Sequence, residues 1–390
     1  MSRRREQLLA AAEAATPKYR RLALVLHENP EIGLEEVKAA TWISEALEAE
    51  GFAVERGVAD LPTAFVAQWG DAGALPVIAF LAEYDALPEL GHACGHNLIA
   101  AAAALAGAAT IKTVAPSEAQ VRVIGCPAEE TYAGKAQLVD RGLFGDVDAA
   151  LMGHGYCQHI GGRPASGRKS VVVEFRGKSA HAAGAPETAV NALDAMILTF
   201  NGISLMRQQL REEARVHGII THGGEAANIV PEYTRGEFYV RAFDPEYLEE
   251  LEHRLIACAR GAAEATGTDL TISAATLPML PIKHNRILEH RYEAHARSLG
   301  ATVSEEPPTG GAGSTDFGNV SRVVPGVHAY FQVSDARVGA HTVEFGLAAK
   351  GEPGLAGMVL GAKAMALTAL DLIDEPGLLE QVRHEFEEDR

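Results

Sequence analysis

The chain has 390 residues, with 34 Lys and Arg against 52 Asp and Glu, and a formal net charge of −18. This length predicts two domains, and the acidic charge argues against a nucleic-acid partner, because binding to phosphates depends on clustered basic residues. The cysteines are too sparse for a secreted disulfide scaffold and predict a cytoplasmic protein; they are Cys94, Cys126, Cys157 and Cys258.

The first part of the chain alternates predicted helices with buried strands. Residues 6–28 and 35–51 carry apolar residues at helical spacing, and the acidic, Ala-rich start of the first segment is unlike a secretion signal. The Ala-rich helix predicted at 98–109 is too short to span a membrane, so we expect no membrane partner. Four apolar runs predict strands, at 63–70, 76–85, 120–130 and 148–155. This alternation indicates an α/β catalytic domain with a mixed, mostly parallel sheet flanked by helices.

The pattern changes near residue 167. From there to residue 282 the predicted order is strand, helix, two strands, helix and strand, which is the order of a ferredoxin-like unit. We therefore expect residues 167–282 to form an inserted lid and dimerisation domain. Residues 1–166 and 283–390 would together form the catalytic, metal-binding domain.

Metal-ligand side chains follow three of the predicted strands. In sheets of this type ligands bind at the carboxyl ends of the strands. Thiolates, imidazoles and carboxylates are ligands that Zn, Mn and Co accept. The candidate residues are Cys94, His96, Glu129, Glu130 and His154, with His341 from a later loop.

Each part of this set has another explanation when it is taken alone. Cys94 and His96 could be ordinary turn residues, and a single histidine is more often hydrogen-bonded in a turn. Glu129 and Glu130 would also suit the first turn of a helix, where the dipole favours carboxylates. On an extended backbone their side chains would instead point apart, so that one could bind metal while the other faces the substrate.

Six motifs, in this order, resemble the aminoacylase and carnosinase type of dinuclear metallopeptidase. The similarity is closer to its amidohydrolase branch, which has a cysteine in the metal site, and within it to β-alanyl-lysine dipeptidase and aminobenzoyl-glutamate hydrolase. The motifs are HENPEIGLEE (27–36), LAEYDALPELGHACGHN (81–97), PAEE (127–130), FRGKSAHAA (175–183), ANIVPE (227–232) and GSTDFGNVS (313–321).

The resemblance implies two divalent metal ions (Zn, Mn or Co) and a homodimer formed through the inserted domain. It implies that Glu129 is the general base, that Asp85 orients a ligand, and that His181 reaches a neighbouring subunit's site and steadies the oxyanion. Asn228 and Arg241 would hold the substrate carboxylate. Glu83 stands where many relatives have Asp and receives no role. The implied metal ligands are Cys94, His96, Glu130, His154 and His341.

The expected function is metal-dependent hydrolysis of an amide bond in a dipeptide or N-acyl amino acid with a free carboxylate. A dipeptide with a basic C-terminal residue is the first expectation, and aminobenzoyl-glutamate or another N-acyl amino acid is the alternative. A metal-dependent binding protein without activity is the least favoured reading, because the base and all five ligand positions are present.

Overall fold

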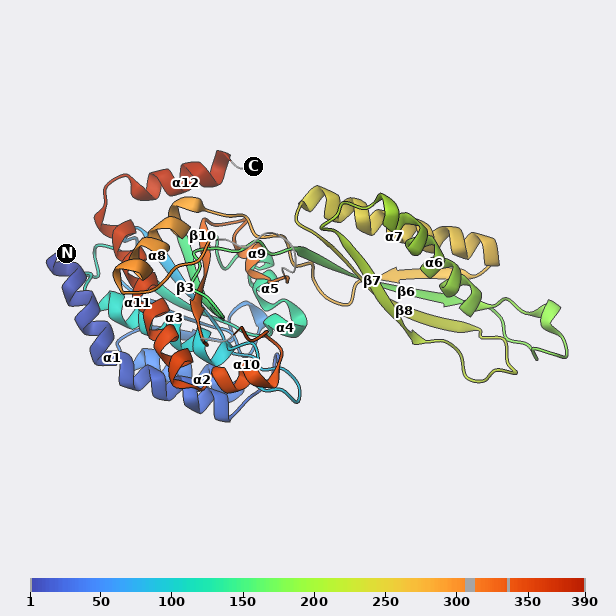
Figure 1. Cartoon of the computed structure of the whole chain (residues 1–390), viewed down its shortest axis with the longest axis horizontal. Helices are drawn as coiled ribbons and strands as arrows, with labels where there is room; N and C mark the ends of the chain where they lie inside the picture. Colours follow the sequence, from blue (N-terminus) through green and yellow to red (C-terminus); the bar gives the residue numbers. More distant parts are fainter. Residues whose placement is uncertain (1, 306–312, 335–336, 389–390) are drawn as a thin grey trace. The chain divides into compact units, whose positions relative to one another are not determined.

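The computed structural model describes residues 2–305, 313–334 and 337–388. The chain forms two compact units, and each is described here by itself (Figure 1). The first comprises Met1–Arg163, Lys283–Pro308 and Asn319–Arg390. Residues 164–166 and 313–318, which we expected in the first unit, belong to the second, where the backbone N–H of Ser166 donates to the Gly313 carbonyl at 2.9 Å.

The first unit contains a six-stranded sheet in the order β1-β2-β4-β3-β5-β10. Strands β4, β3, β5 and β10 are parallel, whereas β1 and β2 run antiparallel at one edge. The prediction of a mixed, mostly parallel sheet is confirmed. The strands are β1 (Ala53–Arg56), β2 (Phe65–Trp69), β3 (Val77–Glu83), β4 (Gln120–Cys126), β5 (Ala149–Tyr156) and β10 (Gly326–Gln332).

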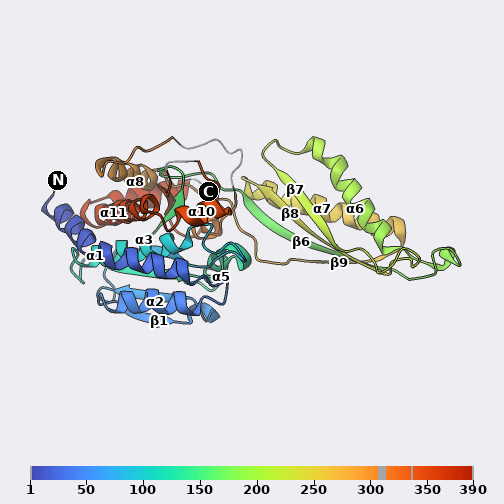
Figure 2. The same cartoon turned by 60° about the horizontal axis from the view of Figure 1, so that its bottom comes forward.

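Helices α3 (His96–Ile111) and α11 (Glu352–Asp374) pack on the central strands, and α1 (Arg3–Glu28) packs outside them (Figure 2). Every residue of α3 is buried. Its run of alanines lets the helix lie close to the sheet, as Gly107 does beside Val123. Helix α11 is long and apolar enough to cross a membrane, but 78% of its most apolar window is buried in this core.

Shorter helices complete the first unit. They are α2 (Val37–Glu48), α4 (Glu129–Tyr132), α5 (Gly134–Asp140), α8 (Arg286–Ser298), α10 (Val343–Ala348) and α12 (Leu378–Glu388), with the 3₁₀ turn η1 (Val58–Asp60). Helix α9 (Phe317–Val320) begins at the end of the 313–318 segment.

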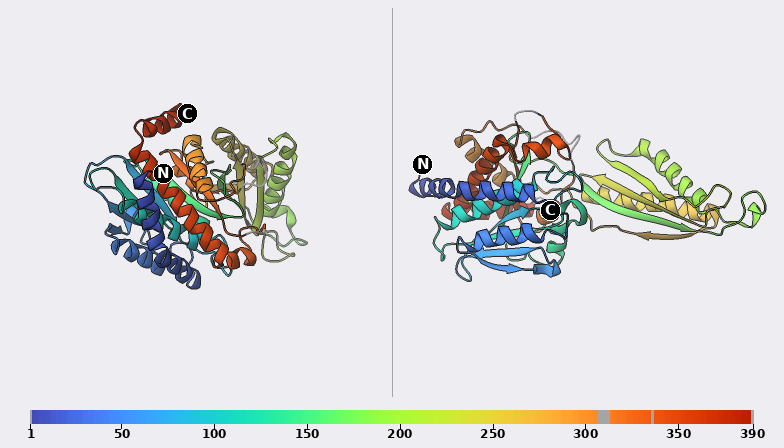
Figure 3. Two further views of the ribbon diagram at one scale, coloured as in Figure 1. Left: turned by 60° about the vertical axis from the view of Figure 1, so that its left-hand side comes forward. Right: turned by 90° about the horizontal axis from the view of Figure 1, so that it is seen from below.

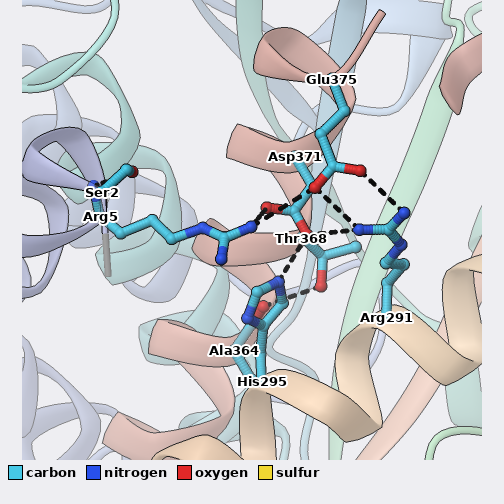
Figure 4. Close-up of polar contacts among 8 residues, drawn as sticks. All are labelled: Ser2, Arg5, Arg291, His295, Ala364, Thr368, Asp371 and Glu375. Atoms are coloured by element: carbon cyan, nitrogen blue, oxygen red, sulfur yellow. Dashed lines mark hydrogen bonds and ion pairs between the residues drawn. The ribbon is translucent and has the colours of Figure 1, made fainter. Parts of the chain in front are cut away.

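A polar network ties α1, α8 and α11 together around Asp371 (Figure 4). The buried Asp371 carboxylate accepts hydrogen bonds from Arg5 Nη2 and from His295 Nε2, each at 2.7 Å. Arg291 donates to Glu375 at 2.8 Å and lies 3.4 Å from Asp371. Three chain segments that are distant in sequence are thereby fixed beside one another.

The second unit has the predicted order of a ferredoxin-like domain. Its antiparallel sheet has the order β7-β8-β6-β9, and both long helices pack on one face (Figure 3). The elements are β6 (Gly167–Arg176), η2 (Pro186–Thr188), α6 (Ala192–Met206), η3 (Arg207–Gln209), β7 (Arg215–His222), β8 (Tyr233–Ala242), α7 (Pro245–Thr266) and β9 (Asp269–Ser273).

Candidate metal centre

Cys94 and His96 lie where the chain passes from β3 into α3. Gly95 between them has a φ of +80°, a conformation that favours glycine, and a side chain there would meet Phe345 at 3.2 Å. His96 is the first residue of α3, so the buried Ala-rich helix fixes its backbone. The strand-to-helix turn therefore presents a thiol and an imidazole at the carboxyl end of the central sheet.

Glu129 and Glu130 do not lie on an extended backbone, and of the two arrangements that the sequence left open the structure has the first turn of a helix. Strand β4 ends at Cys126, Pro127 has no N–H to continue the ladder, and Ala128 has a φ of +57°. The two glutamates then form the first turn of the one-turn helix α4. Although they are neighbours on a helix, one carboxylate oxygen of each lies within 4.8 Å of the other's and of a His96 ring nitrogen.

His154 comes from β5, and His341 precedes α10. His154 Nδ1 donates to the Gly155 carbonyl at 2.8 Å, which leaves Nε2 as the nitrogen that faces the cluster. His341 has a φ of +64°, and its backbone N–H donates to the Ala93 carbonyl at 2.8 Å. This contact anchors a distant loop to the turn that carries Cys94.

The structure brings the five proposed ligands and Glu129 together. Three sets each have their ligand atoms within 4.8 Å of one another. The shortest contacts are His341 Nε2 to Glu130 Oε1 at 3.2 Å and Cys94 Sγ to His154 Nε2 at 3.7 Å. The sets are Cys94, His96 and His154; Cys94, Glu130 and His341; and His96, Glu129 and Glu130.

Asp85 links two members of this cluster. Its Oδ1 accepts a hydrogen bond from His96 Nδ1 at 2.8 Å, and its Oδ2 accepts one from the Glu130 backbone N–H at 3.0 Å. Asp85 is 1% exposed, so it has no competing contact with solvent. The carboxylate fixes the His96 ring with Nε2 directed toward the other proposed ligands.

Burial shifts the protonation of the cluster. It raises the pKa of the Cys94 thiol to about 12 and lowers the pKa of His154 to about 4, so His154 is neutral at pH 7 and able to donate a lone pair. Burial opposes ionisation of Glu130, but the hydrogen bond with His341 and the charges of His96 and His341 together outweigh it and lower the pKa of Glu130. The same bond raises the pKa of His341.

The chemistry of this set suits a divalent cation. His96 Nε2 is buried and has no hydrogen-bond partner, although it lies 3.8 Å from Glu130 Oε1. An unpaired buried nitrogen costs free energy that a metal–ligand bond would recover. One thiol, three imidazoles and a carboxylate also match the ligand preferences of zinc and its neighbours in the first transition series.

Glu83 and Lys135 lie beside the cluster, and the sequence analysis gave them no role. Glu83 Oε2 is 3.5 Å from His96 Nε2, and Lys135 forms an ion pair with Glu83 although both side chains are almost completely buried. Glu83 and Asp85 are two residues apart at the end of β3, a spacing that predicts the same direction for both side chains. That spacing could have predicted that Glu83 lies near the cluster, whereas no sequence pattern indicated a role for Lys135.

The three proposed residues of the second unit fall into two places. His181 and Asn228 lie in adjoining loops, where the Ala182 N–H donates to the Asn228 carbonyl at 3.0 Å. Arg241 lies near the far end of β8, about 26 Å along the strand from Tyr233, where β8 begins on the Asn228 side. The structure therefore does not bring Arg241 together with Asn228 inside one chain.

Comparison with known proteins places this fold among the metallopeptidases. Residues 165–266 match the peptidase dimerisation domain family. The chain is 39% identical to mouse Xaa-Arg dipeptidase, over 96% of this chain and 90% of that protein. It is 31% identical to one of the subunits of the p-aminobenzoyl-glutamate hydrolase of Escherichia coli, over 97% of this chain and 94% of that protein.

Solved structures agree in fold. A dinuclear metal-binding peptidase of the M20 family from Bacillus subtilis superimposes with a TM-score of 0.70 at 20% identity, over 93% of this chain and 99% of that one. The fold and its cluster define the class of metallopeptidases with an inserted dimerisation domain. The chain belongs to the M20 peptidase family. The predicted resemblance, fold class and enzyme class are confirmed.

Proposed function

We propose that the protein is a metal-dependent hydrolase that cleaves the amide bond of a dipeptide or N-acyl amino acid with a free carboxylate. Its similarity to the Xaa-Arg dipeptidases of mouse and human favours a basic C-terminal residue in the substrate. An aminobenzoyl-glutamate type of substrate is the second candidate, supported by the 31% identity to the E. coli hydrolase.

The observation that carries the proposal is the convergence of five ligand side chains from four separate segments around one carboxylate, Glu129. We propose that two divalent ions, Zn, Mn or Co, are held by Cys94, His96, Glu130, His154 and His341. When bound, they supply Lewis acidity that activates water near neutral pH and polarises the amide carbonyl.

Glu129 is the proton carrier in this proposal. It is 7% exposed and starts α4, so its position is fixed by the backbone rather than by a flexible loop. It takes a proton from the attacking water and later gives that proton to the leaving amine. Asp85 contributes indirectly, because it holds the His96 ring and the Glu130 backbone in place.

We further propose a homodimer formed through the second unit. Strand β7 is an edge strand of its sheet and exposes Ile219 and Ile220, and α6 exposes three further apolar side chains. An unpaired strand edge beside apolar surface suits pairing with a second copy. The exposed residues of α6 are Ile197, Leu198 and Leu205.

A dimer also explains the separation of the substrate-binding candidates. His181 and Asn228 adjoin a cavity of about 490 Å³ lined by Ala182, Ala227 and Ile229 among others. In our proposal these two residues serve the partner's site, where His181 steadies the oxyanion. Arg241, at the other end of β8, holds the substrate carboxylate.

Hydrolysis of a panel of dipeptides and N-acyl amino acids, with and without a chelator, tests this function. We expect turnover that is lost with chelator and restored by Zn, Mn or Co. Absence of turnover on every compound by metal-loaded protein would favour the binding protein. The chain has only 4 cysteines, too few for a secreted disulfide scaffold, and we therefore propose the reducing cytoplasm as its location, where Cys94 remains available as a ligand.

A further inference from the structure

Two arginines of the second unit lie directly opposite each other on neighbouring strands. Arg168 in β6 pairs with Arg241 in β8, so both side chains point to the same face of the sheet, with Cβ atoms about 5 Å apart. This is the face that α6 and α7 leave uncovered (Figure 3). Like charges in such positions destabilise a sheet, so an uncompensated pair requires an explanation.

In the described part of the chain, neither guanidinium forms an ion pair with a carboxylate. Arg241 Nη1 donates to Ser314 Oγ at 2.8 Å, and its Nε lies 3.4 Å from His217 Nε2. Arg168 Cζ is 5.0 Å from the centroid of the Tyr239 ring, which holds the side chain by a cation–π contact. Its Nε is buried and has no hydrogen-bond partner.

Two other basic side chains of the same sheet are paired with acids. Lys169, next to Arg168, contacts Glu249 at 2.5 Å and Glu252 at 2.7 Å. Arg235 in β8 forms an ion pair with Glu237. Acidic side chains therefore lie close to Arg168, on the other face of the sheet, but in the described part of the chain none of them pairs with Arg168 or Arg241.

We propose that Arg168 and Arg241 hold the free carboxylate of the substrate between them, with Arg168 as a specificity-determining residue. This inference rests on the proposed function, in which Arg241 alone has that role. Planar guanidinium groups bind carboxylates through two parallel hydrogen bonds, and Arg168 has a buried N–H without an acceptor.

The electrostatics of the pair support this assignment. Burial, and after it the charge of Arg168, lower the pKa of Arg241, so the neighbouring cation adds to the cost of keeping Arg241 charged. A carboxylate placed between them removes this repulsion. A neutral amide offers one acceptor oxygen but no negative charge, so it does not remove this repulsion and cannot accept two parallel hydrogen bonds.

The test measures how variants of Arg168 act on two substrates that differ only in the C-terminal carboxylate. Wild type, Arg168→Met and Arg168→Lys are compared on a hydrolysed dipeptide and on the same dipeptide as its C-terminal carboxamide. Arg176→Met is the matched control, because Arg176 lies at the other end of β6 and makes a similar contact, 4.8 Å from the Tyr233 ring. Calorimetric binding of L-arginine and L-glutamate, and of their carboxamides, repeats the comparison without turnover.

We expect Arg168→Met to reduce kcat/KM for the carboxylate about 10- to 100-fold, mainly through KM, because hydrogen bonds to charged groups are of that strength. The carboxamide should change less than about threefold, Arg168→Lys should recover part of the loss, and Arg176→Met should resemble wild type. Equal losses on both compounds, or no loss on the carboxylate, would overturn the inference.

The binding experiment separates this inference from the proposed function. If no dipeptide or N-acyl amino acid is hydrolysed, the proposed function fails. The carboxylate site is still supported in that case if wild type binds an amino acid more tightly than its carboxamide and Arg168→Met does not. If wild type binds neither amino acid, or if Arg168→Met binds them equally well, the inference fails whether or not the enzyme is active.

Discussion

Asp85 contacts His96 and Glu130 at the same time, and its link to His96 Nδ1 measures 2.8 Å between two fully buried side chains. The imidazole cannot rotate without breaking this bond, so Nε2 is held toward the proposed metal ligands. The order of the site before any metal enters therefore depends on a residue that is not itself a proposed ligand.

Replacing Asp85 with Asn should weaken metal binding by about 10- to 100-fold, because the amide cannot accept a hydrogen bond at both of its polar atoms. Competition with a fluorescent chelator measures the affinity. Asp140→Asn, at the exposed end of α5, is the control and should bind metal as wild type does. Unchanged affinity in the Asp85 variant would show that His96 is oriented without it.

Replacing Glu129 with Gln should lower kcat by at least about 100-fold, because it removes the proton carrier but preserves the size of the side chain. Metal content, measured by mass spectrometry, should remain that of wild type because Glu129 is not a proposed ligand. Substantial activity in this variant would remove Glu129 from the mechanism, and loss of metal would reassign it as a ligand.

Mixing subunits tests whether the site is shared. A chain carrying Glu129→Gln and a chain carrying His181→Ala should each be nearly inactive alone. Mixed dimers should recover up to about half of the wild-type sites if His181 serves the partner, because one of the two sites then has both groups intact. Mixed dimers that form but stay inactive would place both residues in the site of the same chain.

Cys94 should be a thiolate ligand in the loaded protein although burial raises the pKa of its thiol to about 12 without metal. Cobalt-loaded wild type should therefore show a sulfur-to-cobalt charge-transfer band in the near ultraviolet. The band should disappear in Cys94→Ser and persist in Cys258→Ser, whose cysteine lies on α7. A band that survives in Cys94→Ser would assign the thiolate elsewhere.

The network around Asp371 should make the first unit sensitive to acid. Burial raises the pKa of this carboxyl, but its bonds with His295 and Arg5 outweigh burial and leave the pKa below its usual value. Because the folded pKa is lowered, the stabilisation is fully present above the unfolded value of about 4 and is lost as the pH falls through the folded value.

Asp371→Asn should accordingly lower the free energy of unfolding at pH 7 by about 2 kcal/mol, since it leaves the buried His295 and the partly exposed Arg5 without their carboxylate partner. Urea titrations between pH 7 and pH 3 should show a shallower dependence on pH in the variant than in wild type. Parallel curves would mean that Asp371 titrates alike in the folded and unfolded chains.

The sequence predicted the architecture and most of the cluster for a clear physical reason. Cys94 and Glu130 follow β3 and β4, and His154 lies near the end of β5. These strands are adjacent and parallel, so their carboxyl ends meet at one edge of the sheet. The helical start at Glu129 was one of two alternatives that the sequence left open, because the choice depends on the left-handed conformation of Ala128, a residue type that rarely adopts it.

Features that depend on pairing between distant segments could not be predicted from the sequence. Arg168 and Arg241 are far apart along the chain, and only the register of β6 against β8 places them side by side. The ion pair of Lys135 with Glu83 likewise follows from the packing of α5, which resembles a surface helix in sequence. A shift of one residue in the pairing of β6 with β8 would separate the Arg168 and Arg241 side chains.

Anomalous diffraction from crystals of the manganese-loaded protein tests the central claim most directly, because it locates the ions independently of activity. We predict two strong peaks per chain, both within coordination distance of side chains from the set Cys94, His96, Glu130, His154 and His341, with the Glu129 carboxylate beside them. Fully loaded protein with its peaks elsewhere, or with none among these side chains, would contradict the account.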